Sequence, residues 1–300
     1  MTTAGEAADF QAHRPLLFSI AYRMLGSASD AEDVLQDAWL RYRGAVDVRS
    51  PKALAATIVT RLCLDRLKAA RTARERYVGP WLPEPVLTSP AEGPDVMLQR
   101  SESVTLAFLV LLEALSPEER AVFILKEAFD YEHAEIAEML GLTPENSRQL
   151  FHRAKARLRA GRPRLEGTPR SRRAVAEKFV AAFAAGDVEA MTGLLARDVG
   201  LWSDGGGKAS AARRPLLGRD VVLNFLRGLH RVGVTTGIVA RVSWTVAEAN
   251  GEPAVLQRLD GRLDAVYVIS VAGDAIEGVR IVRNPDKLVY IERQLEARPS

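Results

Sequence analysis

The sequence predicts a multidomain protein in which two all-α domains are followed by an α+β domain. Three observations support this fold class. Apolar residues recur with helical spacing from about residue 8 to residue 75. A proline-rich break over 77–95 precedes a second helical stretch that reaches residue 160. Beyond residue 171, helical segments are followed by runs in which apolar and polar residues alternate, which is typical of β-strands.

These breaks divide the chain into five expected segments. They are a helical domain at 8–76, a linker at 77–95, a second helical domain at 96–160, an α+β domain at 172–290 and a tail at 291–300. A length of 300 residues with 47% apolar residues is ample for several hydrophobic cores without disulfide or metal support.

Composition limits the classes of protein that fit. The one cysteine, Cys63, excludes an intramolecular disulfide and favours a reduced, cytoplasmic setting. We see no signal peptide and no apolar run long enough to cross a membrane, so we expect no membrane association. Ten Lys or Arg residues against one acid lie between Arg148 and Arg173, and six more lie between Arg61 and Arg76. Such blocks are usually solvated faces, but two of them on helices favour a polyanionic partner.

The first helical domain contains an acidic amphipathic helix, "DAEDVLQDAWLRY". Its apolar residues follow the spacing of one helical face, and Ser29 with Glu32 predicts a capping box at its start. A later helix is predicted to begin with Ser50 as N-cap and Pro51 at the first helical position. Five prolines in nineteen residues then predict an extended, semi-rigid linker. Helices are expected to resume near Asp95.

The second helical domain contains the strongest local motif. Ser116, Pro117 and Glu119 predict a capped helix start. In "YEHAEIAEMLGLTPENSRQLFHRAKARLR", Gly141 predicts a tight turn, Leu142 a buried plug and Thr143 the cap of the next helix. This is the pattern of a helix-turn-helix, whose second helix enters the DNA major groove. The alternative is an ordinary helical hairpin with a solvated basic face.

The second helix of this motif carries the candidate DNA contacts. The side chains suited to base edges are Asn146, Arg148, Gln149 and His152. Those suited to phosphates are Arg153, Lys155, Arg157 and Arg159.

The C-terminal part predicts a mixed layout. One helix is expected to end at Gly186, and "GRDVVLNFLRGLHR" predicts another. The strand predictions are 238–246, 262–271 and 276–284. Several antiparallel strands after two or three helices predict an α+β domain.

The segments in this order resemble an extracytoplasmic-function (ECF) sigma factor of bacterial RNA polymerase. "RPLLFSIAYRMLGSASDAEDVLQDAWLRY" and "SPKALAATIVTRLCLDRLKAARTARERY" resemble region 2, a helical bundle, and Ser116–Arg159 resembles region 4. The resemblance implies that the acidic helix docks on the β′ coiled coil of core RNA polymerase through Asp30, Glu32, Asp33, Gln36 and Asp37. It also implies promoter −10 contacts by Arg61, Arg66, Lys68 and Arg71, and −35 contacts by the helix-turn-helix. Arg61 stands where the family often has Asn.

The linker and the tail resemble the sigma-J type, in which a SnoaL-like domain of the NTF2-like fold is fused to the sigma domains. The segments that carry this resemblance are "YVGPWLPEP", "DGGGK" and "NPDKL". It implies a built-in regulator that replaces a separate anti-sigma factor. The implied regulatory residues are Trp81, Pro83, Asp204, Gly205, Gly206, Gly207, Lys208, Asn284, Pro285, Asp286, Lys287 and Leu288. For each motif taken alone, simple turn chemistry is the alternative.

Two other functions fit parts of the sequence. A one-component regulator would combine the helix-turn-helix with a ligand-sensing domain and would usually be dimeric. An enzyme of the NTF2-like class would use pocket residues such as Trp202, Asp204 and His230, but no His–Asp spacing demands catalysis, so we expect no enzyme activity. The four histidines are scattered, and we expect no metal and no cofactor.

Overall fold

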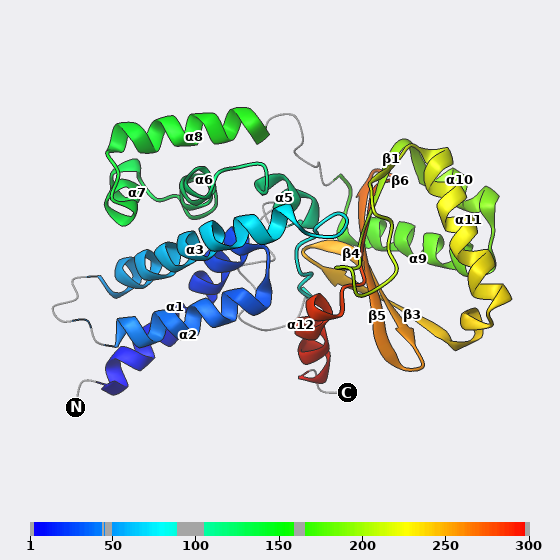
Figure 1. The fold of residues 1–300 in the computed structure, drawn as a ribbon, viewed down its shortest axis with the longest axis horizontal. Helices are drawn as coiled ribbons and strands as arrows, with labels where there is room; N and C mark the ends of the chain where they lie inside the picture. The colour runs from blue at the N-terminus through cyan, green and yellow to red at the C-terminus, as the bar shows by residue number, and fades with distance from the viewer. Residues whose placement is uncertain (1–2, 44, 46–49, 89–104, 159–165, 298–300) are drawn as a thin grey trace. The chain divides into compact units, whose positions relative to one another are not determined.

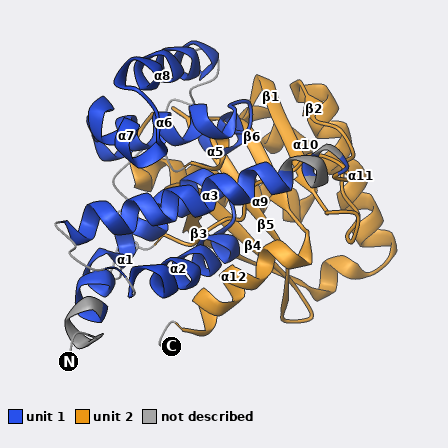
Figure 2. Cartoon of the chain, turned by 60° about the vertical axis from the view of Figure 1, so that its left-hand side comes forward, with its two compact units in different colours: residues 1–76, 90–104, 108–162 blue, residues 77–89, 105–107, 163–300 orange. Residues whose placement is uncertain are grey.

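The computed structural model describes the chain except for residues 1–2, 44, 46–49, 89–104, 159–165 and 298–300. The chain forms two compact units, coloured separately in Figure 2. The N-terminal unit contains residues 1–76, 90–104 and 108–162, and the C-terminal unit contains residues 77–89, 105–107 and 163–300. The residues just before the second helical stretch, near Asp95, lie outside the described part.

The N-terminal unit is built from helices (Figure 1). They are α1 (Thr3–Leu25), α2 (Ala28–Tyr42), α3 (Pro51–Glu75), α5 (Leu106–Leu112, whose first two residues belong to the C-terminal unit), α6 (Pro117–Phe129), α7 (His133–Leu140) and α8 (Pro144–Leu158). Helices α1, α2 and α3 pack on one another, and α6 packs on α8 and also on α1 and α3. Leu17, Ile20 and Tyr22 of α1 are completely buried, so α1 runs through the core of this unit.

Local sequence signals set most helix ends. Ser116 and Glu119 form the predicted capping box, and Ser50 accepts a hydrogen bond from Ala53 N at 3.3 Å. The acidic helix starts earlier than predicted. Ser27, not Ser29, is its N-cap and accepts from Asp30 N at 3.0 Å, because Ser29 already lies inside the helix.

The C-terminal unit is an α+β domain with one sheet. Its helices are α9 (Pro169–Ala185), α10 (Val188–Leu194), α11 (Arg219–Thr235), the 3-10 helix η2 (Ile238–Arg241) and α12 (Pro285–Glu296). Its strands are β1 (Leu195–Asp204), β2 (Leu216–Leu217), β3 (Val242–Ala249), β4 (Glu252–Leu259), β5 (Arg262–Ala272) and β6 (Ala275–Val282). The first helix of this domain begins before the predicted residue 172, since Thr168 caps α9.

The six strands are ordered β2-β1-β6-β5-β4-β3. All neighbours are antiparallel except β1 and β6, which are parallel and pair Ser203 with Ile281. An apolar core fills the space between the sheet and α9, α10 and α11, which lie on one side of it in Figure 1, whereas α12 lies on the other.

The strand predicted at 238–246 is wrong over its first four residues, which form η2. Gly237 has a φ of 71°, and this left-handed turn starts a helical loop before the alternating pattern begins. From Val242 onward the pattern holds, since Val242, Trp244 and Val246 are half-buried while Ser243 and Thr245 are exposed.

Candidate functional site

The acidic helix α2 presents its carboxylates away from the core of its unit. Ala31, Val34, Leu35, Ala38 and Tyr42 are buried, and Asp30, Asp33, Gln36 and Asp37 are exposed. Glu32 differs from the others because it is half-buried and pairs with Arg14 of α1. Four of the five predicted docking residues therefore share one exposed surface.

This surface is already engaged by a predicted DNA contact. Arg66 of α3 lies 3.1 Å from Asp37 Oδ2, 3.6 Å from Asp30 Oδ1 and 3.7 Å from Asp33 Oδ2. Each pair is exposed, so its contribution to stability is about 0–1 kcal/mol. Such weak pairs can be exchanged for a partner's charges at little cost.

Two of the other predicted −10 residues, Arg61 and Lys68, also have partners within the unit. Arg61 Nε donates to the carbonyl oxygen of Met139 in α7 at 2.8 Å, and Lys68 Nζ lies 3.0 Å from Glu118 Oε1 of α6. Arg71 belongs to α3, but its side chain lies outside the described residues. The predicted −10 surface of α3 thus faces the helices of the predicted −35 domain.

Arg120 of α6 joins the two helical regions through buried hydrogen bonds. Its side chain is 3% exposed and donates to the carbonyl oxygens of Met24 at 2.7 Å and Leu112 at 2.6 and 3.0 Å. Desolvation lowers its pKa, an effect that Glu113, 2.8 Å away, opposes. A buried guanidinium needs acceptors for its N–H donors, because water cannot supply them. The contact between the two helical regions therefore has a defined geometry.

The helix-turn-helix is present as predicted. Gly141 takes the left-handed conformation at φ 68° and ends α7, and Thr143 Oγ1 accepts from Asn146 N at 3.2 Å at the start of α8. Leu142 is half-buried rather than fully buried. One contact was not predicted from the sequence: His133 Nδ1 lies 2.9 Å from Ser147 Oγ and joins α7 to α8.

The exposed residues of α8 fall into two groups. Asn146, Arg148, Gln149 and His152 are exposed, and the one ion pair that the structure gives this group joins Arg148 to Glu145. Arg153 and Arg157 lie 3.5 Å and 2.6 Å from the buried carboxylate of Glu119, and Lys155 lies 3.4 Å from Glu127. The three described residues predicted to contact phosphates therefore also have partners inside the unit. Arg159 lies outside the described residues.

The C-terminal unit binds the linker through a buried ion pair. Lys287 Nζ lies 2.7 Å from Asp204 Oδ2, and the two side chains are 9% and 0% exposed. Asp204 also accepts from Leu82 N at 2.9 Å and from the Tyr77 hydroxyl at 2.7 Å. Lys287 donates to the carbonyl oxygen of Leu82 and lies 4.1 Å from the centre of the Trp81 ring. The linker is held at both its backbone and its aromatic side chains.

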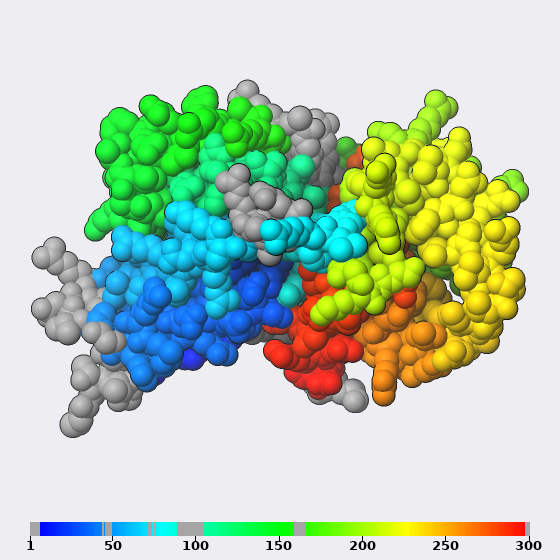
Figure 3. Space-filling model, in the orientation of Figure 1, coloured from blue at the N-terminus to red at the C-terminus, as the bar shows by residue number. Residues whose placement is uncertain are grey.

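The linker continues along the C-terminal unit as far as Thr88. Asn250 and Val86 exchange two hydrogen bonds, Val86 N to Asn250 Oδ1 at 3.0 Å and Asn250 N to Val86 O at 2.9 Å. The side-chain amide of Gln294 bonds Leu87 N at 2.8 Å and Leu87 O at 3.2 Å. Pro83 is buried within this segment. The cyan segment in Figure 3 lies against the yellow-green loop that follows β1.

The glycines of the "DGGGK" motif allow the loop after β1 to lie close to Asn284. Gly206 and Gly207 have φ values of 58° and 73°, and a Cβ on Gly206 would lie 2.3 Å from Asn284 Nδ2. Gly205 has no room for a Cβ either, which would meet Ala209 O at 2.1 Å. Lys208 pairs with Asp286 on the surface.

The "NPDKL" motif forms the start of α12. Asn284 is the N-cap of α12 and accepts from Asp286 N at 3.1 Å, and Pro285 takes the first helical position. Its amide also donates to the Tyr77 hydroxyl at 2.9 Å, and Leu288 is buried. This start of α12 orients the side chain of Lys287 toward the linker. Sequence reasoning missed Asn250 and Gln294, which carry no motif of their own, and did not single out Tyr77 within "YVGPWLPEP".

A cavity of about 610 Å³ lies between the sheet, α9 and α11. Of the three residues considered for a catalytic pocket, His230 lines this cavity, but Trp202 and Asp204 do not. The reason is strand alternation, because Trp202 and Asp204 flank Ser203, which faces the cavity from β1. His230 packs edge-on against Phe183 and lies 3.3 Å from Ala184 O. No group of three potential metal ligands occurs among the described residues.

Comparison with protein families identifies the class. Residues 10–73 match the Sigma-70 region 2 model, and residues 105–158 match the Sigma-70 region 4 model. Both matches fall on the helical segments whose charged surfaces are described above. Among the described residues, no helix is long and apolar enough to cross a membrane.

Individual relatives narrow this class. The chain is 36% identical over 289 residues to the ECF RNA polymerase sigma factor SigJ of Mycobacterium tuberculosis. The matched residues cover 94% of this chain and 93% of SigJ. The chain is 31% identical over 296 residues to the probable ECF RNA polymerase sigma factor SigI of the same species, covering 96% and 97%. The chain therefore belongs to the ECF sigma factor family.

The crystal structure of Mycobacterium tuberculosis SigJ matches with a TM-score of 0.77 at 33% identity and covers 95% of this chain and 98% of that one. The fold class predicted from the sequence is thus confirmed: helical sigma regions 2 and 4 are followed by a C-terminal domain with a six-stranded sheet. The one-component regulator is not favoured, since the matched relatives are sigma factors along nearly their whole length.

Proposed function

We propose that this chain binds core RNA polymerase and directs transcription initiation at specific promoters, and that its C-terminal domain regulates this activity in cis. Full-length similarity to ECF sigma factors is the observation that carries the first part. Promoter recognition uses polymerase in the compartment that holds the chromosome, which fits the reduced setting expected from the single cysteine.

In this proposal the exposed face of α2 docks on the β′ coiled coil. Asp30, Asp33, Gln36 and Asp37 supply charged and polar groups that set orientation and association rate. Glu32 plays a supporting part, since it pairs with Arg14. Docking competes with Arg66 for the same carboxylates, and release of Arg66 frees it for the −10 DNA.

The described arrangement of regions 2 and 4 fits a resting form. The −10 and −35 elements are named for positions about 25 base pairs apart, which is about 85 Å along B-DNA. Yet α3 and α7 touch through Arg61 and Met139, and α1 and α6 touch through Met24 and Arg120. The two regions must therefore separate before both elements are bound.

The C-terminal domain is suited to control the separation of regions 2 and 4, because it holds the segment that connects them. Residues 77–88 are held at Asp204, Lys287, Asn250 and Gln294. Leu106 N, where region 4 begins, donates to Glu252 Oε2 of the same unit at 3.0 Å. Both ends of the connection between regions 2 and 4 are thus fixed to one domain, and no separate anti-sigma factor is required. The carboxylate oxygens of Asp204 already accept hydrogen bonds from the linker and from Lys287. Asp204 therefore fits a regulatory rather than a catalytic role.

Run-off transcription with core polymerase tests the proposal. The full chain, a chain truncated near Arg170 and the Asp204→Asn variant would be compared on candidate promoters. We expect transcription that depends on the added protein, and a rate that changes by several fold in both altered forms. Asp274→Asn, in the exposed turn between β5 and β6, is the matched control.

The outcomes separate the two parts of the proposal. Dependence on the protein without any change in the altered forms would retain the sigma activity and reject regulation by the linker contact. If folded full chain and truncated chain both fail to support initiation, the sigma activity itself is rejected.

A further inference from the structure

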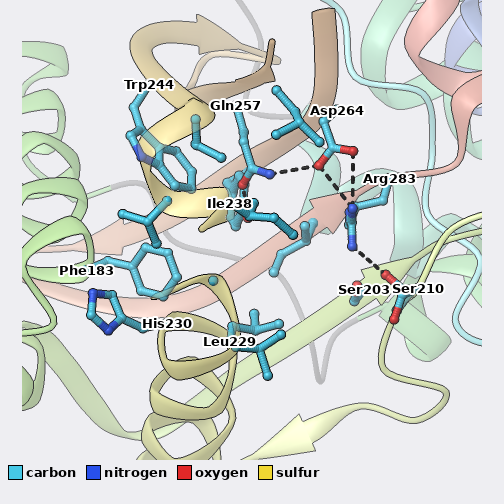
Figure 4. A pocket seen from close by; sticks show the side chains of 18 of the residues that line it. Phe183, Ser203, Ser210, Leu229, His230, Ile238, Trp244, Gln257, Asp264 and Arg283 are labelled. Atoms are coloured by element: carbon cyan, nitrogen blue, oxygen red, sulfur yellow. Dashed lines mark hydrogen bonds and ion pairs between the residues drawn. The ribbon is translucent and has the colours of Figure 1, made fainter. Parts of the chain in front are cut away.

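The cavity of the C-terminal unit has an apolar wall of aromatic rings (Figure 4). Phe183 and Trp244 meet edge to face with centres 5.8 Å apart, and Trp244 meets Tyr267 at 5.6 Å. Phe225 lines the same space from α11. Leu229 and Val239 also line it while remaining 37% and 41% exposed. Such a surface favours rings, which pack offset or edge-on against other rings.

The opposite end of the cavity is polar and internally connected. Asp264 accepts from Gln257 Nε2 at 2.7 Å and from Arg283 Nη2 at 3.0 and 3.2 Å. Gln257 accepts in turn from the Tyr267 hydroxyl at 2.6 Å, and Arg283 Nη1 donates to Ser210 O at 2.8 Å. Figure 4 shows Gln257, Asp264, Arg283 and Ser210 joined in this chain of contacts. A few polar groups in an apolar pocket are what fixes the orientation of a small ligand.

The charge at this end is balanced. The guanidinium of Arg283 is paired with the carboxylate of Asp264, so this end of the cavity offers no net charge to a bound molecule. A charged ligand would lose its hydration without gaining a free counter-charge. A neutral oxygen can instead exchange hydrogen bonds with the amide, guanidinium and hydroxyl groups that gather there.

We propose that this cavity binds an uncharged, ring-containing small molecule that carries one hydroxyl or carbonyl oxygen. The rings lie against Phe183, Phe225 and Trp244, and the oxygen meets the Gln257–Asp264–Arg283 end. A volume of about 610 Å³ is within the range of pockets for drug-sized molecules.

The site lies next to the residues that hold the linker. Ser203 and Arg283 line the cavity, and their chain neighbours Asp204 and Asn284 contact Tyr77. The backbone joins the two sites further, since Arg283 N donates to Asp204 O at 2.7 Å. The binding proposal itself rests on the cavity alone and does not depend on the proposed transcriptional function.

Binding would be tested on the full chain with prodan, a neutral naphthyl ketone whose fluorescence reports an apolar environment. Competitors are 2-naphthol, naphthalene and 2-naphthoate, which share their rings and differ in the polar group. Leu229→Trp fills the cavity, and Leu217→Trp, an exposed position outside it, is the matched control. Gln257→Leu removes a polar group while keeping the approximate side-chain volume.

We expect prodan to bind wild type and Leu217→Trp alike, and Leu229→Trp at least tenfold more weakly. We expect 2-naphthol to displace prodan at a concentration at least tenfold lower than either naphthalene or 2-naphthoate, and Gln257→Leu to remove its advantage over naphthalene. Equal binding to wild type and Leu229→Trp, preference for 2-naphthoate, or no binding to folded wild type would each overturn the proposal.

Discussion

Lys287 Nζ lies 2.7 Å from Asp204 Oδ2, so two motifs 83 residues apart form one buried ion pair. Both side chains are buried, and both charges are satisfied by linker groups: Leu82 N and the Tyr77 hydroxyl on Asp204, and Leu82 O on Lys287. Replacing a buried pair with apolar residues is often neutral, whereas removing one partner is costly. The pair therefore makes linker binding depend on both motifs together.

Asp204→Asn tests this dependence. The change leaves Lys287 buried without its counter-charge, which costs about 3–5 kcal/mol. We expect the linker to detach, because the amide keeps only one acceptor oxygen, so that either Leu82 N or the Tyr77 hydroxyl loses its partner. Hydrogen exchange at Leu82 N measures the result, and exchange there should rise by at least a hundredfold. Asp274→Asn, in the exposed turn between β5 and β6, should leave it unchanged, and unchanged exchange in Asp204→Asn would contradict the role of the pair.

Arg66→Ala tests competition on the acidic face of α2. Removing Arg66 frees Asp30, Asp33 and Asp37, so we expect the association rate with core polymerase to rise several fold at low salt and less at high salt. Asp33→Ala with Gln36→Ala should lower the affinity about tenfold or more. Binding can be followed by fluorescence anisotropy, with Glu189→Ala, on the exposed surface of α10, as the control. Full-strength binding by the Asp33/Gln36 variant would reject the docking assignment.

Arg61→Ala tests the closed arrangement of regions 2 and 4. The substitution removes the 2.8 Å hydrogen bond to Met139 O, which contributes about 0.5–1.5 kcal/mol. The open population should therefore rise by about two- to tenfold. Distance measurements between labels on α2 and α8 would detect the shift. Arg41→Ala, on the exposed surface of α2, should not change the distance distribution. An unaltered distribution in Arg61→Ala would show that this bond does not restrain opening.

Two substitutions in α8 should have different effects on promoter binding by the polymerase complex. Gln149→Ala should relax sequence preference at one position, since a bidentate amide–adenine contact discriminates by about 1–3 kcal/mol. Lys155→Ala should weaken binding to all sequences alike and reduce the salt slope by about one. Arg157→Ala is a poorer probe because it also leaves the buried Glu119 without its 2.6 Å partner. Equal loss on all sequences for Gln149→Ala would exclude a base contact.

Glu252 should make stability depend on pH. Complete burial raises the pKa of its carboxyl above the ordinary 4.5, opposed by Arg280 and by the hydrogen bonds from Ser270 and Leu106. Between 4.5 and the raised pKa the folded state binds more protons than the unfolded state, so the free energy of unfolding falls as pH rises through this window. Glu252→Gln should remove that component. Urea unfolding of both proteins from about pH 4.5 upward checks this, and parallel pH profiles would contradict it.

The local parts of this fold could be read from the sequence. Helix starts at Ser50, Ser116 and Thr143 depend on a side chain three residues or fewer from the amide it caps, and the turn at Gly141 depends on one backbone conformation. Amphipathic spacing likewise determines which face of α2 is exposed. The predicted N-cap at Ser29 is wrong because Ser27 offers the same capping chemistry two residues earlier.

Tertiary structure decided the rest. Whether Asp204 faces the cavity or the linker depends on strand register, and a shift of one residue would exchange the two faces. The engagement of Arg66 by α2 and of Arg61 by α7 joins residues 29 and 78 positions apart. The linker's partners Asn250 and Gln294 belong to no local pattern. The sequence alone thus determined most helix starts, the helix-turn-helix and the family. Which charged groups meet was decided by packing, because these pairings join residues far apart along the chain.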